Sequence, residues 1–125
     1  MTTYTVLHLK NLRDADGDAY LLKRDDFLMV AQVEVEDELE VEAQLEVAYK
    51  ATNSIHHHWS ENSGVTQTQE KPQRSTSVGD VIYNEKTGVH WIVSMIGFNK
   101  VTIDYKTDYG VYRHSITGKQ IFIPA

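Results

Sequence analysis

The chain contains no cysteine, only two prolines and no long hydrophobic run. Without cysteine there is no disulfide bond, no thiolate zinc site, no iron–sulfur cluster and no cysteine nucleophile. No apolar segment approaches the ~18 residues of a membrane-spanning helix, and the first residues lack the basic and then apolar pattern of a signal peptide. These absences predict a cytoplasmic protein, and 125 residues suffice for one domain with its own core.

Net positive charge is missing too, because the formal net charge is −6. This balance argues against a general binder of nucleic-acid phosphates, which needs many Lys and Arg residues. The charge is uneven: residues 14–46 hold twelve acidic and two basic residues, a formal charge of −10, which leaves +4 for the remainder.

The acidic segment has two interpretations. A solvated acidic face can simply keep the protein soluble, or it can imitate nucleic-acid phosphates and occupy the binding groove of another protein. Six glutamates are the candidate contact residues of this acidic face: Glu34, Glu36, Glu38, Glu40, Glu42 and Glu46.

Hydrophobic patterning predicts strands on both sides of the middle of the chain. Residues 4–10 and 27–35 form the N-terminal pair. Closely spaced strands separated by Asp/Gly and Thr-Gly turns then predict an antiparallel meander. Its strands are expected at residues 80–83, 89–96, 98–105, 110–115 and 120–123.

The middle of the chain is harder to interpret. An alternating pattern continues beyond residue 38 and is compatible with a hairpin. Strong helix formers and a possible capping box with Asp37 as its first residue favour a helix over residues 38–52, which we predict. Residues 54–76 are polar and predict a long connection, which in so small a domain is either functional or disordered.

Together these elements predict an α+β fold in a single domain, residues 1–125. One main helix is expected to pack on a small curved antiparallel sheet or partly closed barrel. The acidic strand-helix part covers residues 1–53, the loop residues 54–76 and the β-rich part residues 77–125.

Three consecutive histidines suggest a metal site, with His56, His58 and Glu61 as weak candidate ligands. Neighbouring residues of an extended chain point to opposite faces, so three in a row seldom serve one tetrahedral site. A polar loop packed beside Trp59 is the favoured interpretation.

Residues 14–25 resemble a calcium loop in the spacing of their carboxylates. However, Ala19 stands where the turn requires glycine, Asp25 replaces the usual bidentate glutamate, and the preceding segment predicts a strand rather than a helix. An Asp-Gly turn explains the segment better, and we predict no metal and no other cofactor.

Catalytic motifs are absent: there is no Gly-x-Ser-x-Gly elbow, no His-Glu-x-x-His pair, no phosphate-binding glycine loop and no dinucleotide fingerprint. No catalytic residue is therefore predicted, and an enzyme is the least supported class. The C-terminal half interleaves aromatic and basic residues, which can stack nucleic-acid bases or can simply pack a sheet. They are Tyr83, Trp91, Tyr105, Tyr109 and Tyr112 with Lys100, Lys106, Arg113 and Lys119.

A longer pattern runs through the middle of the chain. It reads Leu45-Glu46-x-x-Tyr49-x-x-x-Asn53, Trp59-x-x-Asn62-x-x-Val65, Arg74-Ser75-Thr76-Ser77-Val78-Gly79-Asp80-Val81-Ile82 and Gly97-Phe98. This pattern resembles the small YodL-like proteins of bacteriophages and other bacterial mobile elements. The resemblance covers about the central half of the chain, favours the helix over the hairpin and implies no activity.

The motif residues have a structural interpretation of their own. Arg74 can fork onto a carboxylate or a helix C-terminus, Ser75 and Ser77 can cap or bond local backbone, and Gly97 can break a strand so that Phe98 turns inward. This interpretation is favoured over a binding pocket made by Arg74, Ser75, Ser77 and Asp80. The full motif set is Asn53, Trp59, Asn62, Arg74, Ser75, Ser77, Gly79, Asp80, Gly97 and Phe98.

The leading hypothesis is a small phage or mobile-element protein that binds another macromolecule through its acidic face. Inhibition of a host protein that handles nucleic acid or provides defence is the concrete form. The alternative is a nucleic-acid or nucleotide-binding module that uses the basic aromatic C-terminal sheet. No membrane partner is expected, and the sequence leaves the oligomeric state open.

Overall fold

A computed structural model describes residues 1–10, 27–54, 57–104, 109–113 and 120–121, with side chains through residue 101. Its strands form one antiparallel sheet in the order β3-β2-β1-β4-β5-β6-β7-β8. The strands are β1 (Thr2–Leu9), β2 (Phe27–Val35), β3 (Val65–Gln67), β4 (Val81–Asn84), β5 (His90–Val93), β6 (Phe98–Asp104), β7 (Tyr109–Arg113) and β8 (Gln120–Ile121). The α+β prediction is confirmed, with strands dominating.

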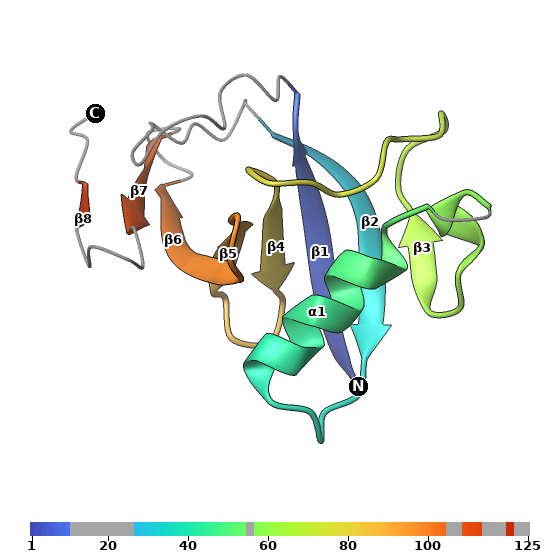
Figure 1. Ribbon diagram of the computed structural model, residues 1–125, viewed down its shortest axis with the longest axis horizontal. Coiled ribbons are helices and arrows are strands. Elements are labelled where there is room, and N and C mark those ends of the chain that lie inside the picture. Colours follow the sequence, from blue (N-terminus) through green and yellow to red (C-terminus); the bar gives the residue numbers. More distant parts are fainter. Residues whose placement is uncertain (11–26, 55–56, 105–108, 114–119, 122–125) are drawn as a thin grey trace.

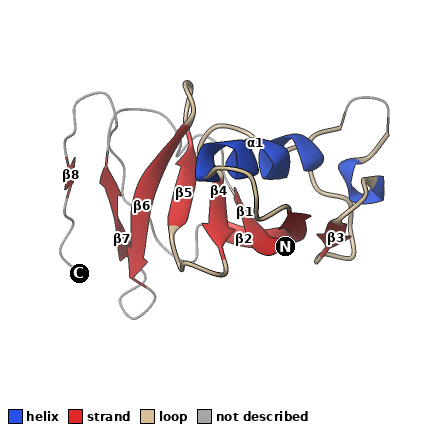
Figure 2. Cartoon of the chain, turned by 90° about the horizontal axis from the view of Figure 1, so that it is seen from below, coloured by secondary structure: helices blue, strands red, loops and turns tan. Residues whose placement is uncertain are grey.

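One α-helix, α1 (Val41–Ala51), lies across one face of the sheet (Figures 1 and 2). Its buried side chains Gln44, Leu45 and Ala48 face the sheet, while the charged side chains point outward. The helix lies within the predicted range 38–52 and excludes the hairpin alternative. It is the sheet, however, that makes up most of the described structure.

The predicted capping box is wrong. Glu40 precedes the helix and makes no side-chain cap. Asp37 instead accepts a hydrogen bond from the N-terminal amine at 2.8 Å and one from Thr2 Oγ1 at 2.6 Å. These contacts to the start of the chain hold the carboxylate away from the helix, and they lower the pKa of Asp37 to about 2.

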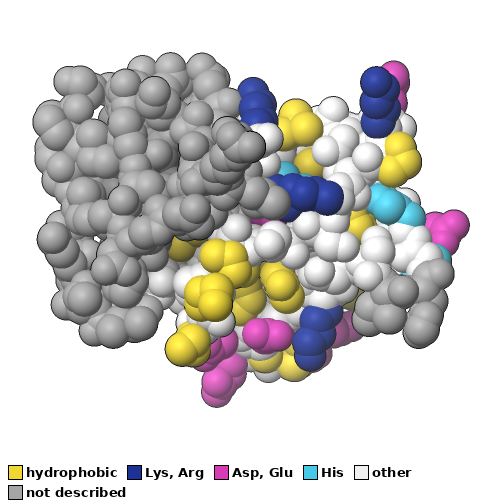
Figure 3. Space-filling view, turned by 45° about the horizontal axis from the view of Figure 1, so that its top comes forward, with side chains coloured by type: hydrophobic (Ala, Val, Ile, Leu, Met, Phe, Trp, Pro, Cys, Tyr) yellow, Lys and Arg dark blue, Asp and Glu magenta, His cyan; other side chains and the backbone are white. Residues whose placement is uncertain are grey.

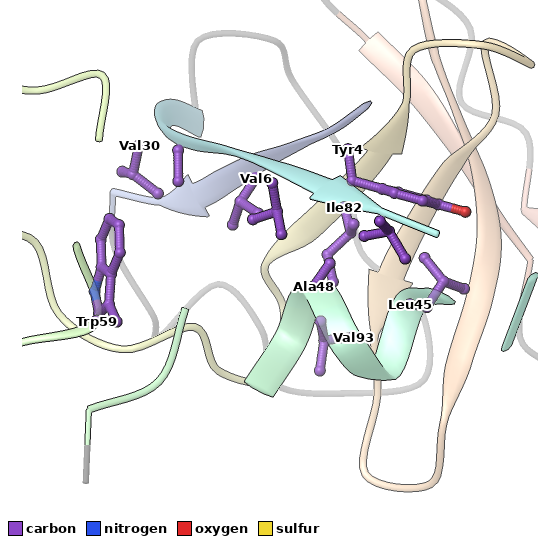
Figure 4. Close-up of a cluster of buried hydrophobic side chains, with 11 residues drawn as sticks. Tyr4, Val6, Val30, Leu45, Ala48, Trp59, Ile82 and Val93 are labelled. Carbon is purple, nitrogen blue, oxygen red and sulfur yellow. The ribbon is translucent and has the colours of Figure 1, made fainter. Parts of the chain in front are cut away.

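Strand β1 is the centre of the packing. It pairs with β2 on one side and β4 on the other, with a register shift between Val6 and Leu7 on the β2 side. Tyr4 and Val6 are fully buried beneath α1, where they meet Leu45 and Ala48 (Figure 4). The opposite face of the sheet carries a second, smaller hydrophobic cluster of Leu9, Phe27, Val81, Ile92 and Val101.

Residues 54–76 contain more structure than predicted. A 3₁₀ turn, η3 (Trp59–Glu61), is followed by β3, which pairs with β2 at the edge of the sheet. Trp59 is fully buried, and its Nε1 donates to the carbonyls of Gln73 and Arg74, both at 3.0 Å. The segment therefore folds around an anchored indole instead of forming a plain connection.

Candidate functional site

Arg74 and Asp80 of the motif form a salt bridge in which the carboxylate is fully buried and the Arg74 side chain is 33% exposed. Arg74 donates from Nη1 to Asp80 Oδ2 at 2.7 Å and from Nη2 to Asp80 Oδ1 at 2.8 Å. Asp80 is fully buried and also accepts from the backbone N–H groups of Leu9 and Ser77, at 2.8 and 2.7 Å. Four donors thus satisfy one carboxylate, which offsets the cost of burying its charge. We call Arg74, Asp80 and their neighbours His8, Thr52 and Thr76 the buried hub.

The hydrogen bonds of the hub fix the tautomer of His8. Thr52 Oγ1 donates to the Ala48 carbonyl at 2.9 Å, so it accepts from Thr76 Oγ1, 2.7 Å away. Thr76 Oγ1 therefore accepts from His8 Nε2 at 2.9 Å, which places the proton on that nitrogen. His8 Nδ1 is buried and makes no hydrogen bond with the described residues. Burial, above all, lowers the pKa of His8 to about 4.

Other motif residues form hydrogen bonds with the segments that lead into the hub. The Asn53 side chain donates to the Tyr49 carbonyl at the end of α1, and Asn62 Nδ2 donates to the Ala51 carbonyl at 2.8 Å. Ser75 Oγ accepts from the Ser54 amide at 2.9 Å. The hub thus joins β1, the end of α1 and the start of β4. These contacts support the structural interpretation of the motif.

The candidate metal ligands are not brought together. His58 bonds Ser60 and the Gln73 carbonyl, and it stacks on Trp59 with 4.8 Å between ring centroids. His56 lies outside the described residues. Within the part of the chain that is described, no three His, Asp or Glu side chains are grouped as metal ligands.

The six candidate glutamates are all exposed but do not share one face. Glu34 lies between the buried Val33 and Val35 of β2, so it points to the side of the sheet away from α1. Its Oε1 accepts from Thr3 Oγ1 at 2.6 Å. Glu42 and Glu46 lie four residues apart on α1 and therefore share one side of the helix.

A shallow cleft of about 210 Å³ lies beside that side of α1. Its walls come from the helix, from the segment before β4 and from the β5–β6 turn, which rises beside α1 on the same side of the sheet (Figure 2). The residues that line it are Glu46, Tyr49, Val78, Val93, Ser94, Met95, Gly97 and Phe98. The rings of Tyr49 and Phe98, which both line it, meet edge to face with their centroids 6.3 Å apart.

The tip of the β5–β6 turn is unusually apolar. Met95 and Ile96 are 87% and 83% exposed, whereas tight turns normally carry Gly, Asn or Asp. The Ser94 amide donates to the Gly97 carbonyl at 3.0 Å, and Gly97 has φ +78°, so the turn needs a glycine there. Sequence reasoning noticed Gly97 and Phe98 but missed this tip, although two apolar residues directly before Gly97 were the available signal.

The basic aromatic C-terminal surface is described only in part. Lys100 Nζ lies 5.4 Å from the centre of the Trp91 ring. The Tyr83 ring instead stacks on His90, at 4.3 Å between centroids. The side chains of Tyr105, Lys106, Tyr109, Tyr112, Arg113 and Lys119 lie outside the described residues.

The chain matches no family model, no curated protein and no solved structure. The resemblance to YodL-like proteins therefore stays a prediction. Among the described residues, no helix combines the length and apolar character that crossing a membrane requires.

Proposed function

We propose that this is a small cytoplasmic phage or mobile-element protein that binds and inhibits a host protein through the exposed acidic residues of β2, α1 and their connection. The target would be a protein that handles nucleic acid or provides defence. One observation carries the proposal: residues 34–46 contain seven acidic residues and no Lys or Arg, and all seven acidic side chains are exposed.

Most of this charge has no local partner. Asp37 pairs with the N-terminal amine at 2.8 Å and lies 4.0 Å from Lys86 Nζ. Within the described part of the chain, Glu36, Glu38, Glu40, Glu42 and Glu46 form no ion pair, so a cationic surface could approach them. Such a field speeds association with a basic groove and weakens as salt rises.

An affinity pull-down from nuclease-treated bacterial lysate tests the proposal. The wild-type protein should capture a stoichiometric nucleic-acid-binding protein that salt or competing DNA releases. Replacing Glu34, Glu36, Glu38, Glu40 and Glu42 with Gln should abolish capture. The control E61Q/E70Q removes exposed charge elsewhere and should bind normally. Unchanged capture by the five-glutamine variant would reject these acidic residues as the contact.

The alternative, a nucleic-acid or nucleotide-binding module, is favoured by the cation–π contact of Lys100 with Trp91. Titration with labelled single-stranded oligonucleotides at low salt separates the two functions. An inhibitor that imitates phosphates should not bind them, whereas a binding module should do so with steep salt dependence. Binding that K100Q weakens would favour the alternative.

A further inference from the structure

We infer that the cleft beside α1 binds an apolar side chain from a cationic segment of a partner protein. The inference rests on the proposed protein-binding function and names the kind of segment that the site would take. Its basis is the juxtaposition of an apolar cleft, an exposed apolar turn and two acidic side chains on one side of the helix.

The apolar surface of the cleft comes from α1, from the segment before β4, and from β5, β6 and the turn between them. Tyr49, Val78, Val93 and Phe98 line the cleft and are partly or fully buried, so they give it a preformed wall. Exposed Met95 forms the adjoining rim, and Ile96 extends the turn beyond it. Methionine adapts its shape to different apolar ligands, and clustered exposed apolar side chains commonly mark an interaction site.

The charged side chain in the described lining of the cleft is acidic. Glu46 lines the cleft itself, and Glu42 Oε1 lies 3.5 Å from where a Cβ on Gly97 would be, so its carboxylate lies against the turn. Among the described residues that line the cleft there is no Lys or Arg; the exposed Lys50 follows Glu46 by four residues and lies on the same side of the helix, beyond the cleft. Figure 3 shows hydrophobic side chains gathered on the described surface, with acidic side chains and one basic side chain beside them.

This combination selects its occupant. An apolar side chain would displace water from the cleft, while a Lys or Arg within a few residues of it would lie close to Glu42 and Glu46. Charge complementarity of this kind disfavours acidic segments and nucleic acid. The occupant is therefore a protein segment that is both apolar and basic.

Selection from a displayed library of random twelve-residue peptides tests the inference. Peptides that bind the wild-type protein, but not M95S/I96S, should share an apolar residue with Lys or Arg within three positions. A synthetic consensus peptide should lose about tenfold in affinity with M95S/I96S. It should lose about fivefold with E42Q/E46Q at low salt, and less at 0.5 M salt.

Two controls keep this result specific. E61Q/E70Q removes the same formal charge at exposed residues that do not line the cleft, and M29S removes an exposed apolar side chain from β2. Both should keep affinity within about twofold of the wild type. Because all these side chains are exposed, circular dichroism should show that every variant folds.

Several results would overturn the inference. They are an absence of enriched peptides, a consensus without basic residues, equal affinity for M95S/I96S, or a dimer that M95S/I96S dissociates. The last result would assign the cleft to a second copy of the chain. If M95S/I96S and E42Q/E46Q still capture the lysate partner while the five-glutamine variant does not, the proposed function holds and the cleft inference fails.

Discussion

At the scale of single residues, Asp80 has the most demanding environment. It is fully buried and accepts four hydrogen bonds, two of them from Arg74. D80N would remove the charge and leave the guanidinium without its carboxylate, so we expect a loss of about 3–5 kcal/mol in the free energy of unfolding. Urea denaturation measures it. D37N, at an exposed ion pair, should cost far less, and equal losses would contradict this account.

His8 makes stability depend on pH. Its pKa is about 4 in the folded protein and 6.5 in the unfolded chain, so the unfolded state binds more protons between these values. The contribution of His8 to the free energy of unfolding is therefore fully present above pH 6.5. It falls as the pH drops toward 4, by up to about 1.4 kcal/mol per pH unit. His90 shifts in the same direction, again through burial.

Unfolding curves between pH 4 and pH 7 test the role of His8. H8Q should flatten the pH dependence by about one proton, although it also lowers stability at neutral pH. H57Q changes an exposed histidine and should keep the wild-type slope. A wild-type slope in H8Q would mean that His8 is not a source of the acid sensitivity.

At the scale of elements, α1 depends on packing more than on its ends, because no side chain caps its first turn. Leu45 is 1% exposed and packs beneath the helix, so L45A should lower the free energy of unfolding by about 2–5 kcal/mol. V47A removes a similar side chain from the exposed side and should change it little. Thermal or urea unfolding of both variants compares them, and equal effects would show that this helix face is not buried.

Most strands could be predicted because their signal is local. Residues 27–35, a β-rich apolar run that ends in alternation, predicted β2 with its observed bounds, and turn residues separated the strands of the meander. What could not be predicted depends on partners far along the chain. The Asp37 carboxylate accepts a hydrogen bond from the N-terminal amine instead of capping the helix. The three residues of β3 form a strand because they pair with β2. The closure of the sheet into a partial barrel stays a prediction.

The candidate site was predictable to a smaller degree. Sequence patterns identified Arg74 and Asp80 and suggested a fork onto a carboxylate, but not that His8 and Thr52 join them from other elements. The exposed glutamates were identified by their charge, although their division between two faces required the register of β2 and the position of α1. The cleft was missed because its walls meet only in three dimensions.

At the scale of the whole molecule, protection should be greatest at the middle of the sheet. Strands β1 and β4 are paired on both sides, and their Val6 and Ile82 are fully buried. Hydrogen exchange should therefore be slowest for amides that β1 and β4 donate to neighbouring strands, and faster for those of the edge strand β3. Amide exchange followed by NMR measures this, and equally slow exchange in β3 would contradict the expected order.

The position of β1 also matters while the protein is being made. Its hairpin partner β2 is translated soon afterward, but its other partner β4 ends at Asn84. At roughly 5–20 residues per second, the ribosome needs about 2–9 s to advance from Val35 to Val81. Throughout that interval one edge of β1 is open to pairing with other nascent chains. The strand at the centre of the finished sheet thus has an unpaired edge during part of its synthesis.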